Sequence, residues 1–213
     1  DREDVNKATA QKITISGLKN TSDYNLFFEE NSSDIPNQEA FLMKNDLPKA
    51  IVNEVLEGKV TNTFGPYEDN NFIKYLKENR FKGASFYRTV TNNNQLEDSI
   101  KIAVIQGGLY EENHPSLLPP IIHENTAQTN IKHLNGVISM ARYEPGTATF
   151  EFFICIGDQP DLDYGGKRNP DGEGFAAFGR VIYGMDVVNT IHKQPEHNQY
   201  LTPKIPILGM EPE

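Results

Sequence analysis

The side chains that most often carry enzyme chemistry are sparse in this 213-residue sequence, which has one cysteine and five histidines. The histidines are His114, His123, His133, His192 and His197. They do not recur on one face of a helix, so their spacing predicts surface or loop positions rather than a metal site. We therefore expect neither a metal nor another cofactor.

Nucleophilic chemistry is also unsupported. Cys155 lies inside the apolar run Phe152–Ile156, which predicts a small buried core residue rather than a reactive thiol. No Gly-x-Ser-x-Gly elbow occurs, and neither Ser85 nor Ser139 has a sequence signal for a partnering histidine and aspartate. The polar loop around Asp171 has neither the Lys-Ser/Thr of a phosphate loop nor the alternating ligands of a calcium loop. We interpret it as structural turns.

The composition excludes some partners. A formal net charge of −10 works against binding to a phosphate backbone, so we do not expect nucleic acid as a partner. No run approaches the roughly 18 apolar residues of a membrane-spanning helix, so we expect no transmembrane segment. The chain starts at Asp1 rather than Met, which indicates a processed or trimmed N-terminus and leaves open whether an export signal was removed.

Periodicity and capping residues predict three helices. They cover Asp46–Gly58, Asp69–Arg80 and a segment from Gly184 to Lys193. The first 45 or so residues are polar and rich in Asn, Asp, Glu and Ser. We expect residues 1–50 to form an N-terminal extension, possibly partly helical, and residues 51–213 to form one domain.

Between the second and third helices, five short runs alternate or are fully apolar, with Gly, Pro and Asn-rich turns between them. The runs cover Ser85–Val90, Lys101–Gln106, Gly136–Arg142, Glu151–Ile156 and Ala176–Ile182. A further run, Leu201–Leu208, could close the sheet. This spacing predicts a mainly β fold, an antiparallel β-barrel capped by helices.

Five blocks of sequence, in order, resemble the cyclophilin family. They are Phe86-Tyr87-Arg88, Ile105–Gly108, Asn135–Ala141, Glu151–Ile154 and Phe175–Val188. In the family the first reads Phe-His-Arg, the second contains Gln-Gly-Gly and the fourth reads Gln-Phe-Phe-Ile. The resemblance covers about residues 60–208 and implies a closed eight-stranded barrel with a helix at each end. Val55–Thr63 is our candidate for the opening strand.

The resemblance also implies a peptidyl-prolyl isomerase site. Rotation about an Xaa-Pro bond faces a barrier of about 18–20 kcal/mol, and a guanidinium aimed at the prolyl nitrogen stabilises the lone pair as it leaves conjugation. Arg88 is the implied catalytic residue and Gln106 the group that orients the substrate. The implied substrate-binding residues are Tyr87, Val104, Gln106, Met140, Ala141, Phe153, Leu162 and Phe175. Without the resemblance, Arg88 reads as a surface cation and Phe153 as a core residue.

Several positions depart from the family pattern. Tyr87 and Phe175 replace histidines. Ala103 and Asp161 replace aromatic residues, which predicts a shallower groove and weak inhibition by cyclosporin. Two insertions, Thr91–Ser99 and Gly157–Gly174, could reshape access to the groove.

The favoured hypothesis is an isomerase that acts on Xaa-Pro bonds of unfolded or extended polypeptides and assists folding. The alternative is a proline-peptide docking module of a larger cell-envelope assembly, possibly a membrane-associated complex, with little or no isomerase activity. The Asn-rich composition and two runs, Phe153–Pro160 and Gly165–Gly172, resemble cyclophilins of Bacteroidetes-type bacteria, many of which are exported. We therefore expect a periplasmic or cell-envelope location, with the cytoplasm as the alternative.

Overall fold

The computed structural model describes residues 10–15, 24–30, 68–111 and 113–212. Two predicted elements, the helix over Asp46–Gly58 and the opening strand over Val55–Thr63, lie outside the described residues. Within the described ranges, no helix is long and apolar enough to cross a membrane.

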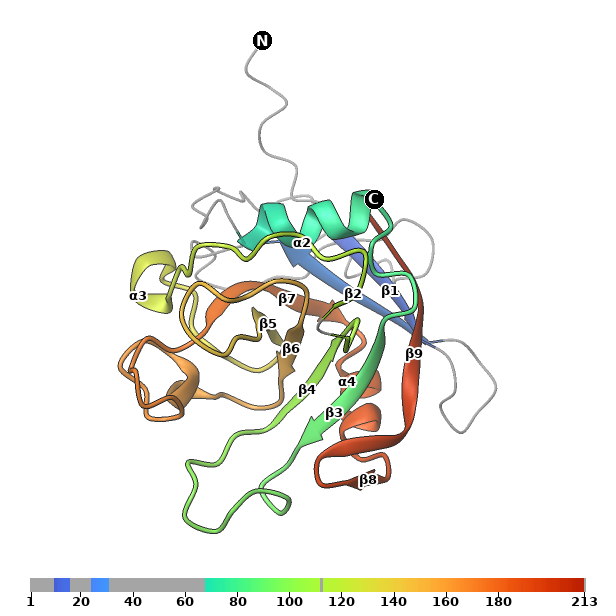
Figure 1. Cartoon of the computed structure of the whole chain (residues 1–213). Coiled ribbons are helices and arrows are strands. Elements are labelled where there is room, and N and C mark those ends of the chain that lie inside the picture. The colour runs from blue at the N-terminus through green and yellow to red at the C-terminus, as the bar shows by residue number, and fades with distance from the viewer. Residues whose placement is uncertain (1–9, 16–23, 31–67, 112, 213) are drawn as a thin grey trace, which may run out of the picture.

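An antiparallel sheet dominates the fold (Figure 1). Its strands in the described residues are β1 (Ala10–Ile15), β2 (Tyr24–Glu30), β3 (Ser85–Val90), β4 (Val104–Gly108), β5 (Val137–Met140), β6 (Phe152–Cys155), β7 (Ala176–Tyr183), β8 (Glu196–His197) and β9 (Tyr200–Pro212). They lie in the order β1-β2-β7-β5-β6-β4-β3-β9-β8, and β1 also pairs with β9. This confirms the predicted mainly β, antiparallel fold, and each predicted run overlaps a strand. The strand count is nine in these ranges rather than the eight expected.

Two strands come from the segment that we expected to be an extension. β1 pairs with β2 and β9, and β2 pairs with β7. The polar composition of residues 1–50 was a poor guide here, because backbone pairing in a sheet is satisfied by N–H and C=O groups whatever the side chains are. These two segments therefore belong to the sheet.

Three helices accompany the sheet in the described residues, whereas the resemblance implied a barrel with one helix at each end. They are α2 (Glu68–Lys77), α3 (Thr126–Thr129) and α4 (Met185–His192), with one 3-10 turn, η1 (Pro160–Leu162). α2 and α4 confirm two of the predicted helices. The one-turn α3 was not predicted. Its start is fixed by a capping box, in which Asn125 accepts from the first turn and Gln128 accepts from the backbone N–H of Asn125.

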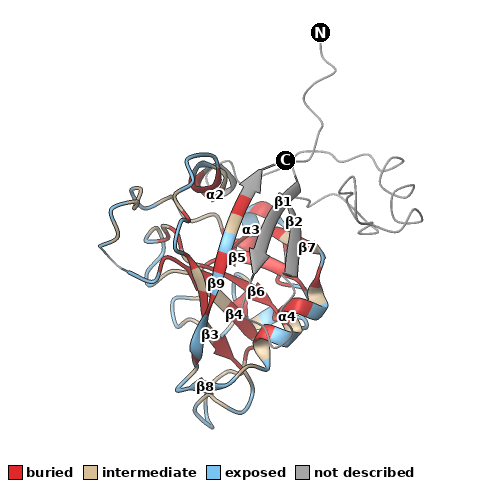
Figure 2. Ribbon diagram, turned by 90° about the vertical axis from the view of Figure 1, so that its right-hand side faces the viewer, coloured by how far each residue is buried: buried red, intermediate tan, exposed pale blue. Residues whose placement is uncertain are grey.

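The main core combines residues of the sheet with residues of α2 and α4. Phe72 of α2 packs against the rings of Phe81, Phe152 and Phe178, with centroid separations of 5.0 to 5.4 Å. Figure 2 shows buried residues concentrated along the central strands. Because Phe72 and Leu76 are one turn apart on α2, both reach this core, as the helical spacing predicted.

A second apolar cluster lies apart from the main core. It consists of Val90, Ile102, Val104, Phe153, Cys155 and Leu162. Cys155 is fully buried, and burial raises the pKa of its thiol well above the usual range. This confirms that Cys155 is a core residue. The cluster forms the apolar floor of the site described next.

Candidate active site

Three neighbouring strands bring the principal predicted residues together. Arg88 on β3 pairs with Gln106 on β4, and Gln106 pairs with Phe153 on β6. The β3 register shifts between Phe86 and Arg88, and such a bulge re-aims the side chain that follows it. The three side chains therefore lie side by side on one face of the sheet.

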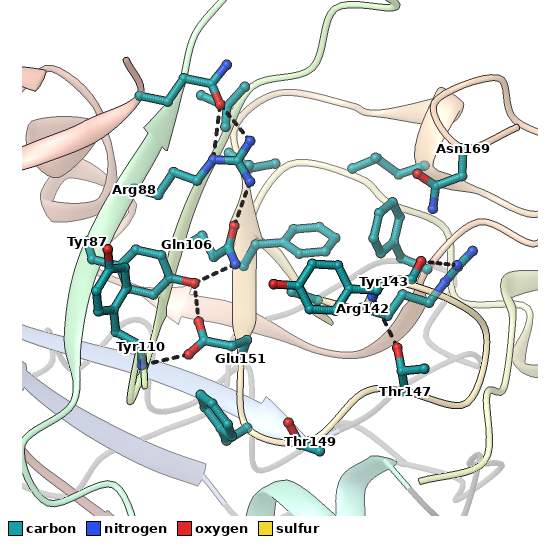
Figure 3. Close-up of a pocket in the computed structure, with 18 of the residues that line it drawn as sticks. Tyr87, Arg88, Gln106, Tyr110, Arg142, Tyr143, Thr147, Thr149, Glu151 and Asn169 are labelled. Atoms are coloured by element: carbon teal, nitrogen blue, oxygen red, sulfur yellow. Dashed lines mark hydrogen bonds between the residues drawn. The ribbon is translucent and has the colours of Figure 1, made fainter. Parts of the chain in front are cut away.

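This face forms one wall of a cavity of about 1040 Å³. Eight of the nine residues implied by the resemblance line it: Tyr87, Arg88, Val104, Gln106, Ala141, Phe153, Leu162 and Phe175. The cavity combines an apolar floor with a polar side that carries Arg88, Gln106, Tyr87 and Glu151 (Figure 3). Mostly apolar walls with a few placed polar groups are typical of ligand sites.

Met140 is the exception. It is 1% exposed, belongs to the main core and does not line the cavity. Because successive residues of a strand point to opposite faces, Met140 at the end of β5 faces the core while the next residue, Ala141, faces the cavity. The expected place of Met140 at the groove is corrected accordingly.

A chain of hydrogen bonds crosses the polar side (Figure 3). Arg88 Nη1 donates to Gln106 Oε1 at 3.0 Å, and Gln106 Nε2 donates to the Tyr87 hydroxyl at 2.6 Å. The Tyr87 hydroxyl donates to the Glu151 carboxylate, which also accepts from the backbone N–H of Tyr110 at 2.8 Å. Because an ionised Glu151 only accepts, Tyr87 must donate to it, and Gln106 is left to present its amide oxygen to Arg88. The order of donors thus fixes the orientation of the Gln106 amide.

Burial holds the proton on Tyr87. It raises the pKa of the Tyr87 hydroxyl well above its usual range, and the charge of Glu151 adds to this rise. Burial also raises the pKa of Glu151, although the hydrogen bonds from Tyr87 and Tyr110 oppose that rise. The raised pKa of Tyr87 keeps the proton on its hydroxyl, and the hydrogen bonds that Glu151 accepts favour its ionised form against the effect of burial.

Gln199 is a site residue that the sequence did not reveal. Its Oε1 accepts from Arg88 Nε at 3.0 Å and from Arg88 Nη2 at 2.6 Å. Its own Nε2 donates to the carbonyl of Asn94, in the inserted loop after β3, at 2.8 Å. The residue sits in the turn between β8 and β9 with a φ of 72°. The run His197-Asn198-Gln199 is compatible with a turn, but no local pattern links it to a residue 111 positions away.

The inserted loop Gly157–Gly174 is attached to the groove through Arg142, another residue missed from sequence. Arg142 donates to both carboxylate oxygens of Asp171, at 2.8 and 3.0 Å, and its guanidinium lies 5.3 Å from the centre of the Phe175 ring. Phe175 in turn meets Phe153 edge to face at 5.2 Å. The loop therefore fixes one wall of the apolar pocket.

The two positions expected to make the groove shallow do not line the cavity. Ile102 lines it instead, whereas the backbone N–H of Ala103 donates to Gln159 Oε1 at 3.1 Å. The backbone carbonyl of Asp161 accepts from the N–H of Arg168 at 3.1 Å, and its side chain caps the same loop. Weak inhibition by cyclosporin stays a prediction.

Behind Phe153 lies a buried Ser-His-Asp arrangement. His133 Nδ1 is 2.8 Å from Asp163 Oδ1, and His133 Nε2 is 3.0 Å from Ser139 Oγ. The His133 ring stacks on Phe153 with 6.0 Å between centres. His133 is 1% exposed and Ser139 is 0% exposed, so neither reaches the cavity. The expected surface position of the histidines is thus wrong for His133, which supports the floor of the pocket.

The family's sequence model, described as cyclophilin type peptidyl-prolyl cis-trans isomerase/CLD, matches residues 53–211. The chain belongs to the cyclophilin family. This cyclophilin is 30% identical over 152 residues to a peptidyl-prolyl cis-trans isomerase of Acinetobacter baylyi, covering 71% of this chain and 73% of that protein. It is 33% identical over 129 residues to one of Streptomyces antibioticus, covering 59% and 70% of the two chains.

Solved structures show the same fold. A cyclophilin type isomerase of Cryptosporidium parvum superimposes with a TM-score of 0.57 at 18% identity, covering 97% of this chain and 98% of that one. A structure of the same protein in the presence of the dipeptide Ala-Pro gives a TM-score of 0.55.

Proposed function

We propose that this chain catalyses cis/trans isomerisation of Xaa-Pro bonds in polypeptides, with Arg88 as the catalytic residue. The observation that carries the proposal is the fixed guanidinium of Arg88, held by Gln106 and Gln199 and facing an apolar cavity floored by Phe153. Its partners are neutral amide oxygens, so its charge is not cancelled within the described residues. A group that stabilises developing charge needs this fixed geometry.

The mechanism follows from how the donors are used. Each terminal nitrogen of Arg88 carries two N–H groups. Nη1 donates one of them to Gln106, and Nη2 donates one to Gln199. One N–H of each remains for the prolyl nitrogen as its lone pair leaves conjugation with the carbonyl. That donation lowers the barrier to rotation.

The remaining residues hold the substrate on either side of the rotating bond. Phe153, Leu162 and Val104 form an apolar pocket for the proline ring. The second N–H of Gln106 Nε2 is available for the backbone carbonyl of the residue before proline, so that one end is fixed while the other turns. The Ala-Pro dipeptide named with the Cryptosporidium parvum structure supports this class of ligand.

Finer proposals follow from the same residues. The β1–β9 pairing supports a closed barrel of eight strands with β8 outside it. Proline-containing unfolded or extended polypeptides are the proposed substrates, with folding assistance as the role. The docking-module alternative is not favoured, because the family and the arrangement around Arg88 both fit an enzyme. A periplasmic location is proposed only from the resemblance to cyclophilins of Bacteroidetes-type bacteria, and cell fractionation tests it.

The decisive experiment compares the intact chain with Arg88→Ala by NMR exchange spectroscopy on an Ala-Pro peptide. The variant is expected to lose at least about 100-fold in catalysed exchange, the size of effect seen when a charge-stabilising donor is removed. Arg80→Ala is the matched control, because Arg80 donates to the carbonyl of Ser116 and does not line the cavity. If neither the intact chain nor the control accelerates exchange, the proposed function fails.

A further inference from the structure

A second arginine lines the same cavity as Arg88. Arg168 comes from the inserted loop Gly157–Gly174 and is half-buried. Its Nη1 donates to Gln95 Oε1 at 3.0 Å and to the carbonyl of Ile100 at 2.6 Å. Both acceptors belong to the segment that joins β3 to β4. The two inserted loops therefore meet at this guanidinium.

The same segment holds both arginines in place. Asn94 accepts from Gln199, which binds Arg88, and the next residue, Gln95, accepts from Arg168. Each guanidinium is thus fixed at one edge before any substrate binds. Of the five N–H donors of Arg168, two are used, and the three on Nε and Nη2 have no partner among the described residues.

Neither positive charge is balanced by a carboxylate in the described part of the chain. Arg88 and Arg168 donate only to amide and carbonyl oxygens. By contrast, Arg142, the third arginine of the cavity, is neutralised by Asp171. Asp161, in the same loop as Arg168, uses its carboxylate to accept from the N–H of Lys167 and forms no ion pair with Arg168.

The two free charges affect one another. Burial and the charge of Arg88 both lower the pKa of Arg168, so the guanidiniums repel each other across the cavity. The chain has a formal net charge of −10, so two arginines without a carboxylate partner in one half-buried cavity form a local excess of positive charge. An anionic group placed between them would relieve the repulsion and could accept two parallel bonds from the free edge of Arg168.

We propose that Arg168 is a specificity-determining residue that selects substrates carrying an aspartate or glutamate within two residues of the proline. The proposal rests on the proposed function, because it concerns the substrate of that site. The arginine comes from an insertion, so the preference belongs to this chain and those that share the loop. Arg88 acts on the prolyl bond, whereas Arg168 binds the neighbouring carboxylate.

The test uses four peptides in NMR exchange spectroscopy at low salt. Two carry Glu, either directly after the proline or two residues before it, and two carry Gln at the same positions. Each catalysed rate is divided by the uncatalysed rate of the same peptide. At least one Glu peptide is expected to exceed its Gln partner by about three- to tenfold, and the excess should shrink with added salt.

Variants separate binding by Arg168 from a merely structural role. Arg168→Gln should bring the Glu-to-Gln ratio to about one, and Arg168→Lys should retain part of it. Lys167→Gln is the control, since it removes the same charge from an exposed neighbour that does not line the cavity. That variant should keep the full ratio.

Each outcome has one meaning. If the intact chain fails to accelerate the Gln peptides as well, the proposed function itself fails. If the Gln peptides are accelerated but both Glu peptides match them or lag, the inference is overturned while the isomerase stands. If Arg168→Gln slows all four peptides equally, Arg168 acts only by tying the two loops together, and the inference is likewise wrong.

Discussion

Gln199 offers the sharpest test of how the catalytic arginine is held. It supplies two of the three hydrogen bonds to the Arg88 guanidinium, at 3.0 and 2.6 Å, and links it to Asn94. The substitution of choice is Gln199→Gly, because the backbone φ of 72° suits glycine, whereas an alanine would keep the backbone strain that glutamine already carries. Glycine therefore removes the side chain without disturbing the turn.

The expected magnitude follows from those bonds. A hydrogen bond to a charged group contributes about 1.5–3 kcal/mol net, and water can replace part of the loss because Arg88 is half-buried. With only Gln106 left to orient the guanidinium, kcat/KM should fall about 10- to 100-fold, mostly through kcat. Exchange spectroscopy on an Ala-Pro peptide over a range of concentrations separates kcat from KM.

Asn198→Gly is the matched control in the same turn. Asn198 also has a positive φ, 52°, but its side chain is exposed and contacts His197 rather than Arg88. It should retain nearly full activity. Equal activity of Gln199→Gly and the intact chain, or equal losses in both variants, would refute the view that Gln199 positions Arg88.

Three further predictions concern stability. Burial raises the folded-state pKa of Glu151, so this group favours folding at low pH, and its contribution is lost as pH rises through the folded pKa. Glu151→Gln should therefore raise the thermal midpoint at pH 7.5, and the gain in thermal midpoint should disappear near pH 5. Burial lowers the folded-state pKa of His133, so the free energy of unfolding should fall as pH drops below about 6.5, by at most about 1.4 kcal/mol per pH unit. In urea unfolding, the free energy of unfolding of His133→Gln should depend less steeply on pH than that of the intact chain. Phe152→Ala should cost about 3–5 kcal/mol in urea unfolding, whereas Leu96→Ala, at an 83% exposed position, should cost almost nothing; comparable costs would contradict the core assignment.

The family resemblance implied those residues of the cavity that lie on regular strands. Arg88, Gln106 and Phe153 come together because three paired strands of the expected sheet carry them in register. Strict alternation could also have separated Met140 from Ala141, since adjacent strand residues face opposite sides.

Contacts made by turns and insertions were not predictable in the same way. Gln199 and Arg168 reach the cavity from loops whose path depends on the whole fold, and no periodicity encodes their partners. The strands β1 and β2 lie in a stretch whose overall polar composition predicted an extension, so their pairing with β7 and β9 was not expected. The sequence therefore did not predict the contacts between distant residues that determine the electrostatics of the site.

The buried Ser139-His133-Asp163 arrangement has a consequence for recognising enzymes by shape. Its two interatomic distances, 2.8 and 3.0 Å, would satisfy a geometric search for a hydrolytic triad. A serine that is 0% exposed cannot meet an acyl group, so a fluorophosphonate probe should leave Ser139 unlabelled. Template searches for triads therefore need an accessibility criterion at the nucleophile, since hydrogen-bond geometry alone also describes three buried polar residues that satisfy one another inside a β fold.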